Sequence, residues 1–147
     1  GGDVTGSAYG TAYKGSQRNY ESQIADVTGP VTVLSANHHG WKDTCNPDFL
    51  WKMKPRAITF SSSNNNHPRE ETVVRCSDPQ YEPNPLLLVN TEAARERLGE
   101  ELWSRFSAPA GHIVIRAYPG GETWQVFVLN SHSGKYEVIY KSEIMTL

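Results

Sequence analysis

The chain has 147 residues, enough for one domain with a buried core, and its 37% hydrophobic and 20% charged residues are typical of a folded protein. Its formal net charge of −2 excludes a broad nucleic-acid surface, which needs clustered Lys and Arg, but leaves room for one substrate phosphate. No apolar stretch approaches the roughly 20 residues that span a membrane. We therefore treat residues 1–147 as a single domain and expect no membrane partner.

The first half of the sequence alternates helix and strand patterns after a Gly- and Ser-rich loop. Tyr20, Ile24 and Val27 have helical spacing, and Gly29 marks the end of that helix. A second helix is predicted after Asn46, a suitable cap, with Pro47 in its first position. The predicted helices are residues 18–29 and 46–54, and the predicted strands are residues 31–36 and 56–62.

The second half begins with a long stretch, residues 62–86, that holds four of the nine prolines and is predicted to be an irregular loop. Asn90 or Thr91 is then expected to cap a helix through residue 106. The apolar side of this helix would carry Ala94, Leu98, Leu102 and Phe106. Three β-rich runs separated by turn sequences follow, at residues 112–118, 123–130 and 136–141. The whole pattern predicts an α/β or α+β layered domain that ends in an antiparallel meander.

The sequence NHHG, residues 37–40, directly follows the first predicted strand. Open α/β sheets place their sites where strands end, and imidazole is a common zinc ligand. Neighbouring residues of an extended chain point in opposite directions, so only one of His38 and His39 is expected to bind a metal. Gly40 would let the backbone approach the ion. Taken alone, the two histidines are equally consistent with an ordinary turn.

Weaker candidates lie elsewhere in the chain. Asp3 follows two glycines, and His67 follows three asparagines and precedes a proline. Either residue alone is more often part of a surface turn. Glu21 is interpreted as a solvated helix residue or a pair for Arg18, and Asp43 as a turn or cap residue that could hydrogen-bond a histidine. The two cysteines do not form a CxxC pair, which favours isolated thiols over a zinc site and leaves a disulfide open.

Four of these motifs together resemble a known family. GGD, then VLSANHHG, then NPDFL followed by KPRAITFS, then NNNHP, is similar to the second half of a metallo-β-lactamase-fold hydrolase. The order is closest to the branch that contains the nuclease-like domain of DNA-uptake competence proteins. The C-terminal GHIVIRAYPGGETWQVFVLN resembles uncharacterised exported bacterial hydrolases. The resemblance covers nearly the whole chain and implies the C-terminal half of a four-layer αβ/βα sandwich.

The resemblance also implies roles for individual residues. Asp3 matches an aspartate that bridges two metal ions, and His38 matches a histidine of the second metal site. His39 and His67 match residues that face the substrate or its leaving group. The implied cofactor is zinc, two ions in the complete enzyme, with manganese as the alternative. Trp41 stands where the competence branch has a serine, which makes nuclease activity on nucleic acid a weaker expectation.

The first metal motif of the family, HxHxDH, does not occur in this sequence. A dinuclear hydrolase needs ligands for both ions, and Asp3 and His38 supply two. We therefore expect the chain to be the C-terminal portion of a longer enzyme, inactive alone, and to associate with an N-terminal half or another chain. The isolated half would expose an inner sheet face that seeks a partner. The sequence does not specify the compartment, and the resemblance is compatible with an exported or periplasmic bacterial location.

These observations lead to two main hypotheses of function. The first is a metal-dependent hydrolase that uses metal-bound hydroxide on an ester, amide, lactone or phosphodiester. The second is a metal-free binding or interaction module that keeps the fold without catalysis. The sequence does not specify the substrate, the metal or the oligomeric state.

Overall fold

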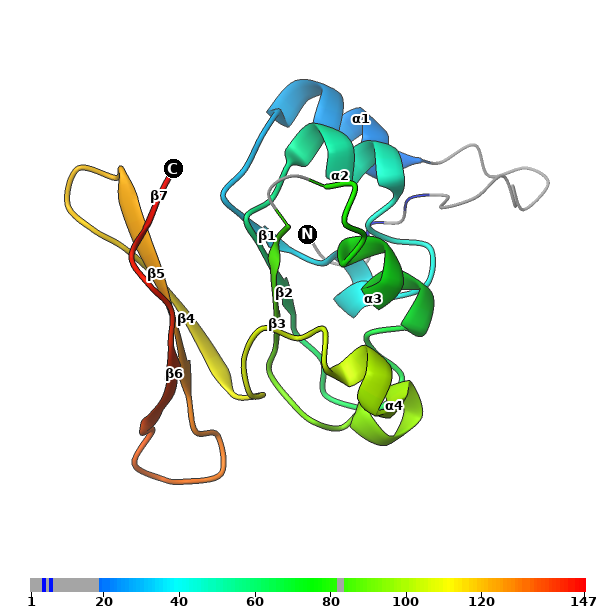
Figure 1. The fold of residues 1–147 in the computed structure, drawn as a ribbon. Helices are drawn as coiled ribbons and strands as arrows, with labels where there is room; N and C mark the ends of the chain where they lie inside the picture. The colour runs from blue at the N-terminus through cyan, green and yellow to red at the C-terminus, as the bar shows by residue number, and fades with distance from the viewer. Residues whose placement is uncertain (1–3, 5, 7–18, 82–83) are drawn as a thin grey trace.

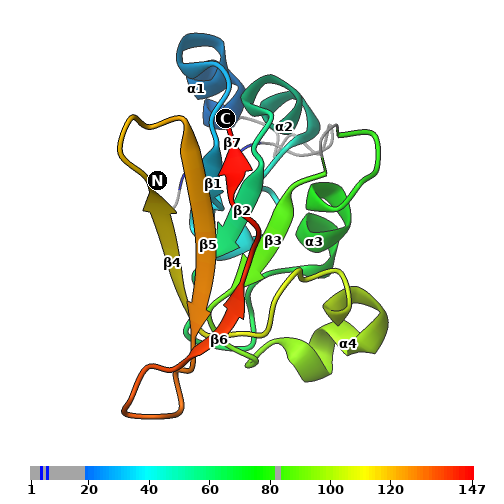
Figure 2. The same ribbon diagram turned by 60° about the vertical axis from the view of Figure 1, so that its left-hand side comes forward.

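The computed structural model describes residues 4, 6, 19–81 and 84–147, and these residues form three layers (Figure 1). A three-stranded parallel sheet lies in the middle, with helices on one face and an antiparallel sheet on the other. Figure 2 shows the two sheets packed against each other. The predicted α/β class is therefore confirmed. Asp3 and the predicted N-terminal loop, except residues 4 and 6, lie outside the described residues.

The parallel sheet has the order β1 (Val33–Ser35), β2 (Ala57–Phe60) and β3 (Leu86–Val89). Val33 pairs with Ala57, and Ala57 pairs with Leu86. Parallel neighbours need crossover connections, and here each connection contains a helix. All three carboxyl ends consequently lie at one edge of the sheet, where the polar segments that follow them meet.

The helices α1 (Tyr20–Thr28) and α2 (Pro47–Met53) confirm two predictions, but α1 buries a different face from the one predicted. Its predicted apolar face is exposed: the exposed fractions are 42% for Tyr20, 39% for Ile24 and 86% for Val27. Glu21 and Ala25 face the interior instead. The interpretation of Glu21 as a solvated residue was therefore wrong.

The segment predicted as an irregular loop contains α3 (Glu70–Cys76), and the strand β3 that follows it was also missed. Thr72, Val73 and Cys76 are buried on α3. The high proline content at both ends of the segment hid a short helix, since seven residues give only two turns of apolar periodicity.

The last helix, α4 (Arg95–Trp103), starts later than predicted and is kinked at Gly99. Ala94 occupies the cap position, without a side-chain hydrogen bond. The side chain of Asn90, one of the two predicted caps, bonds the backbone of Ser62 instead. Tertiary contact between the ends of β2 and β3 thus replaced the expected helix cap.

The antiparallel sheet consists of β4 (His112–Ala117), β5 (Thr123–Leu129), β6 (Val138–Lys141) and β7 (Met145–Thr146). This confirms the three predicted strands and adds a short fourth. Trp124 and Val126 of β5 are buried against Ala57 and Leu88 of the parallel sheet. The expectation of an exposed inner sheet face was therefore wrong for the parallel sheet, because the meander covers it.

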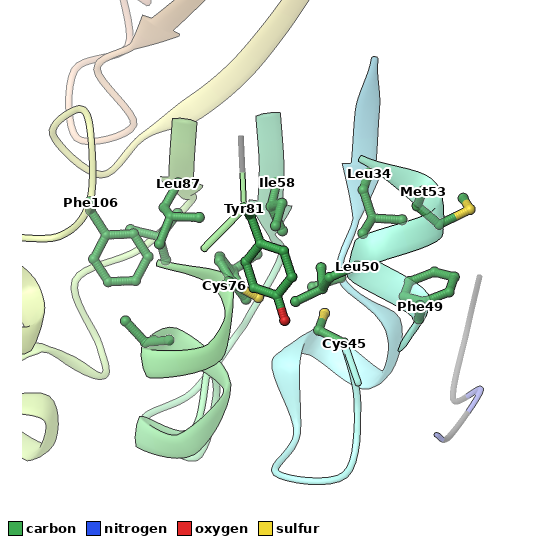
Figure 3. Close-up of a cluster of buried hydrophobic side chains, with 14 of the residues drawn as sticks. Leu34, Cys45, Phe49, Leu50, Met53, Ile58, Cys76, Tyr81, Leu87 and Phe106 are labelled. Atoms are coloured by element: carbon green, nitrogen blue, oxygen red, sulfur yellow. The ribbon is translucent and has the colours of Figure 1, made fainter. Parts of the chain in front are cut away.

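A second core lies between the parallel sheet and the helices. Figure 3 shows part of it, where side chains from β1, β2 and β3 meet those of α2 and α3. Phe49, Ile58, Phe60 and Leu87 are among its most buried members. Within the part of the chain that is described, no helix has the length and apolar character needed to cross a membrane.

Candidate functional site

The NHHG sequence forms a tight turn, η1 (Asn37–Gly40), directly after β1. His38 and His39 both adopt left-handed backbone conformations, with φ of 44° and 56°. This conformation costs about 1–2 kcal/mol for a residue with a side chain. The premise that the two histidines sit on extended chain was therefore wrong. In this turn both rings instead lie within 6 Å of the ring of His67.

Gly40 lets the turn approach the loop that follows β2. Its φ is +84°, and a Cβ built there would lie 2.7 Å from Cδ1 of Phe60 and 2.8 Å from Cβ of Pro68. The backbone N–H of Arg69 donates to the carbonyl oxygen of Gly40 over 2.9 Å. The glycine was expected to make room for an ion, and the structure shows that it makes room for this second loop.

The second loop, residues 61–68, carries His67 and is fixed from both sides. The Asn90 side chain accepts from the N–H of Ser62 at 2.8 Å and donates to its carbonyl oxygen at 2.9 Å. The guanidinium of Arg97 donates to the carbonyl oxygens of Asn65 and Pro68. The peptide bond between His67 and Pro68 is cis. The contacts from Asn90 and Arg97 hold this Asn-rich loop against the end of β3 and against α4.

We call His38, His39, Trp41 and His67 the histidine cluster. The ring centroids of His38 and His67 are 5.7 Å apart, those of His39 and His67 are 5.5 Å apart, and those of Trp41 and His67 are 5.2 Å apart. Residues from two loops, nearly thirty positions apart, are therefore brought together at the carboxyl edge of the parallel sheet. Trp41 joins the cluster although the sequence favoured no particular role for it.

The tautomer of His39 follows from its hydrogen bond with the backbone of Ser61. Its Nδ1 lies 2.5 Å from the carbonyl oxygen of Ser61, which only accepts hydrogen bonds. Nδ1 must therefore carry the proton, and in the neutral ring Nε2 is left with its lone pair. The same carbonyl borders a groove of about 530 Å³ between the two sheets, whose polar lining includes Ser35, Thr59 and His112.

The surroundings of His67 disfavour its charged form. Burial is the main cause that lowers its pKa from the ordinary value of 6.5, and His39, His38, Arg69 and Arg97 add electrostatic repulsion. His67 is therefore neutral at pH 7 and presents both an N–H donor and a lone pair.

Arg69 is a cation for which the described residues supply no carboxylate partner. Its guanidinium carbon lies 5.1 Å from the centroid of the Trp41 ring, within cation–π range. Its Nε is buried and makes no hydrogen bond within the described part of the chain. None of the ion pairs found among the described residues involves it. Nothing in the sequence pattern singled out Arg69, apart from its place directly after the His–Pro pair.

Glu21 connects the segments that lead into and out of the histidine turn, a role that the sequence pattern did not predict. Its carboxyl group accepts from the side chain of Asn37 at 3.0 Å and from the backbone N–H groups of Cys45 at 2.8 Å and Asn46 at 2.9 Å. Burial raises its pKa, and these hydrogen bonds partly oppose that shift. Glu21 thus connects α1, the histidine turn and the start of α2. The possible bond from Asp43 to a histidine is not made through its buried Oδ1, which has no hydrogen-bond partner among the described residues.

The described residues alone do not complete a metal centre. Among them, no group of three or more His, Cys, Asp or Glu side chains is arranged to hold an ion. The imidazole of His38 and the carboxylate of Asp3 are ligand types that zinc accepts, but Asp3 lies outside the described residues. The imidazole and carboxylate donors therefore fit zinc, but two ligands are too few for a zinc site, so further ligands are needed.

Comparison with known proteins gave no relative: neither a protein-family model, nor a curated protein, nor a solved structure matches this chain significantly.

The titration of His67 gives a first prediction. In NMR, its imidazole signals should titrate below pH 6.5, and Arg69→Gln should raise that midpoint by removing one nearby positive charge. Because the folded pKa lies below the unfolded value, His67 lowers stability as the pH falls from about 6.5 through the folded pKa.

Arg116→Gln is the matched control, since Arg116 also lies over an aromatic ring, that of Tyr118, but on the antiparallel sheet. It should leave the midpoint of His67 unchanged. Equal midpoints in the wild type and Arg69→Gln would show that Arg69 does not act on His67.

Proposed function

We propose that this chain forms one side of the active site of a metal-dependent hydrolase, as the C-terminal half of a metallo-β-lactamase-like sandwich. The observation that carries the proposal is the convergence of His38, His39 and His67 at the ends of β1 and β2. These residues come from the same motifs that carry the sequence resemblance. The substrates proposed are an ester, amide, lactone or phosphodiester.

Asp3 and His38 are the proposed metal ligands, with zinc as the first choice, two ions in the complete enzyme, and manganese as the alternative. A bound divalent cation would acidify water toward neutrality and polarise the group to be cleaved. The missing ligands would come from an N-terminal half or from another chain. This requirement follows from the ligand count, since a catalytic zinc needs three protein ligands.

His39 and His67 are proposed to act on the substrate. With its Nδ1 committed to Ser61, His39 presents Nε2 as a proton acceptor. His67 is neutral at pH 7, so its N–H can donate to an oxygen on which negative charge develops. Both roles need the two rings on one side of the substrate, and a centroid separation of 5.5 Å fits that need.

Arg69 gives the proposed site a preference for an anionic substrate. A guanidinium that lies over Trp41 and has no carboxylate partner among the described residues is suited to a phosphate or carboxylate group. The groove between the sheets begins at Ser61, beside His39, and would hold the rest of the substrate. Among the four bond types, this favours the phosphodiester or a substrate that carries a carboxylate elsewhere.

A zinc titration followed by imidazole NMR signals tests the metal proposal without an activity assay. We expect Zn²⁺ to shift the signals of His38 before those of the exposed His112 and His132. Asp3→Ala and His38→Ala should each weaken binding at least about tenfold. His132→Ala, a variant of an exposed turn histidine, should not. A response of His112 and His132 at the same zinc concentration as His38 would contradict the proposal.

A metal-free binding module is the second candidate function. It is favoured by Arg69, whose guanidinium lies over Trp41 and whose buried Nε makes no hydrogen bond among the described residues, because such a group can bind an anion without a metal. It predicts that inorganic phosphate shifts the signals of His67 in the presence of a chelator, while Zn²⁺ leaves His38 unaffected. Arg69→Gln should abolish the phosphate response in that case.

A further inference from the structure

The structure brings together two cysteines that are 31 positions apart in the sequence. Cys45 lies between the histidine turn and α2, and Cys76 is the last residue of α3. Both are free thiols with no exposed surface. Figure 3 shows their sulfur atoms in the same part of the core, close to Leu50 and Tyr81. The sequence favoured isolated thiols, and the fold makes them neighbours.

Two kinds of contact hold this pair in place. The Cys76 thiol is close enough to act on the Cys45 thiol, and this interaction together with burial raises the pKa of Cys45 well above its usual range. The backbones are tied by Arg75, the residue before Cys76, whose Nε donates to the carbonyl oxygen of Cys45 over 3.3 Å. Its Nη2 donates to the carbonyl oxygens of Lys42 at 2.6 Å and Thr44 at 2.7 Å. The residue next to one cysteine is therefore bonded directly to the other.

We propose that Cys45 and Cys76 form an intramolecular disulfide that fixes the two histidine-bearing loops relative to each other. The turn with His38 and His39 leads within a few residues to Cys45, and the loop with His67 leads directly into α3, which ends at Cys76. A covalent bond between the two cysteines would close the chain from residue 45 to residue 76. That segment contains Arg69, and the bond would keep it near Gly40, which lies five positions before Cys45. This proposal does not depend on the metal or on hydrolysis.

The bond would form by exchange with a small disulfide such as oxidised glutathione. One cysteine thiolate attacks the glutathione disulfide and releases one reduced glutathione, which leaves a mixed disulfide. The second thiolate then displaces the other glutathione, so two protons and two electrons leave the protein and reduce the oxidant. Cys76 has no exposed surface in the folded chain but lines a cavity of about 270 Å³ next to Trp51, Lys54 and Gln80, so it is the expected first thiolate once that part of the chain opens.

Burial also determines when the exchange is fast. The thiolate is the reacting species, and the raised pKa of Cys45 keeps it protonated in the folded chain at pH 7. Cross-linking is therefore expected mainly while the chain folds. Protein that has first folded under reducing conditions should be oxidised only slowly afterwards.

Peptide mapping tests the proposal. The full chain is refolded from denaturant with a glutathione redox mixture, alkylated under denaturing conditions and digested with trypsin. We expect one linked pair of peptides, residues 43–52 and 76–95, with no alkylated cysteine and an intact mass lower by about 2 Da. The oxidised monomer should unfold about 5–10 °C higher than the reduced monomer.

Cys76→Ala is the control, since alanine suits the last turn of a helix and Cys45 has a left-handed backbone that disfavours substitution. Its unfolding temperature should not change with the redox mixture. Should this variant not fold, the wild-type peptide map still decides. Alkylation of both cysteines after oxidative refolding, or disulfide-linked dimers in place of the linked monomer, would overturn the proposal.

Discussion

Replacing Glu21 with alanine is expected to lower the free energy of unfolding by about 3–5 kcal/mol. The substitution removes the acceptor for the side-chain N–H of Asn37 and the backbone N–H groups of Cys45 and Asn46, and all of these donors are buried. Among the described residues, no other acceptor bonds these two backbone groups. Urea-induced unfolding at neutral pH measures the loss.

The same variant should disturb the histidine turn before the whole protein unfolds. Asn37 immediately precedes His38, and its only side-chain hydrogen bond among the described residues is the one to Glu21. We therefore expect altered NMR signals of His38 and His39 in the folded fraction of Glu21→Ala. Gln23→Ala, an exposed position of α1, is the matched control and should change stability by less than about 0.5 kcal/mol. A loss below 1 kcal/mol for Glu21→Ala would show that the carboxyl group does not hold the turn.

The pH dependence of stability tells the effect of charging Glu21 apart from the effect of its hydrogen bonds. Desolvation raises its pKa above the ordinary 4.5 in the folded state, so its favourable contribution is complete below about pH 4.5. That contribution is lost as the pH rises through the folded pKa. Relative to Glu21→Gln, which does not titrate, the wild type should lose stability with rising pH in this window. A constant difference between the two proteins from pH 4 to pH 7 would contradict the shift.

Replacing Gly40 with alanine is expected to lower the free energy of unfolding by about 2–4 kcal/mol, the second large effect. The added methyl group would lie within 3.0 Å of both Phe60 and Pro68, distances that real Cβ atoms do not show. Phe60 is fully buried and packs edge-on against Phe106, so it has little room to move. The turn must then withdraw from the loop that carries His67, which should also separate the histidine rings.

Gly120→Ala is the matched control for Gly40→Ala. Gly120 has a similar positive φ of 95°, but nothing lies within 4 Å of the added Cβ. This control should show only the backbone strain, about 1–2 kcal/mol. Chemical denaturation of both variants gives the comparison, and the signals of His67 report on the cluster. Equal losses in the two variants would mean that backbone strain alone explains Gly40 and that the close approach of the loops is not required.

Local chemistry determined several elements that could be predicted from the sequence. Asn46 caps α2 by accepting from the N–H of Phe49 at 2.9 Å, and Pro47 occupies its first turn as expected. The strands of the meander follow from β-branched runs between turn sequences. These features depend on interactions between residues that are close in sequence, and so a sequence pattern is enough to predict them.

Features that rest on distant contacts were missed or misread. The spacing of Tyr20, Ile24 and Val27 predicted the buried face of α1, but the donors that Glu21 satisfies lie 16 to 25 residues further along the chain. A buried carboxyl group with several hydrogen bonds outweighed an apolar stripe on a short helix. Likewise, α3 is too short to give a clear periodic pattern, and its burial depends on packing against β2 and β3.

The candidate site likewise combines features that local sequence predicts with features that depend on distant contacts. The sequence by itself identified His38, His39 and His67 as candidates, because histidines next to predicted strand ends suit a site at the edge of an α/β sheet. Only the tertiary structure decided that these rings lie within 5.5–6.4 Å of each other, that Arg69 and Trp41 join them, and that Cys45 lies beside Cys76. The physical reason is that strand ends follow from local pattern, whereas the distance between two loops depends on the parallel pairing of β1 with β2 and on Gly40.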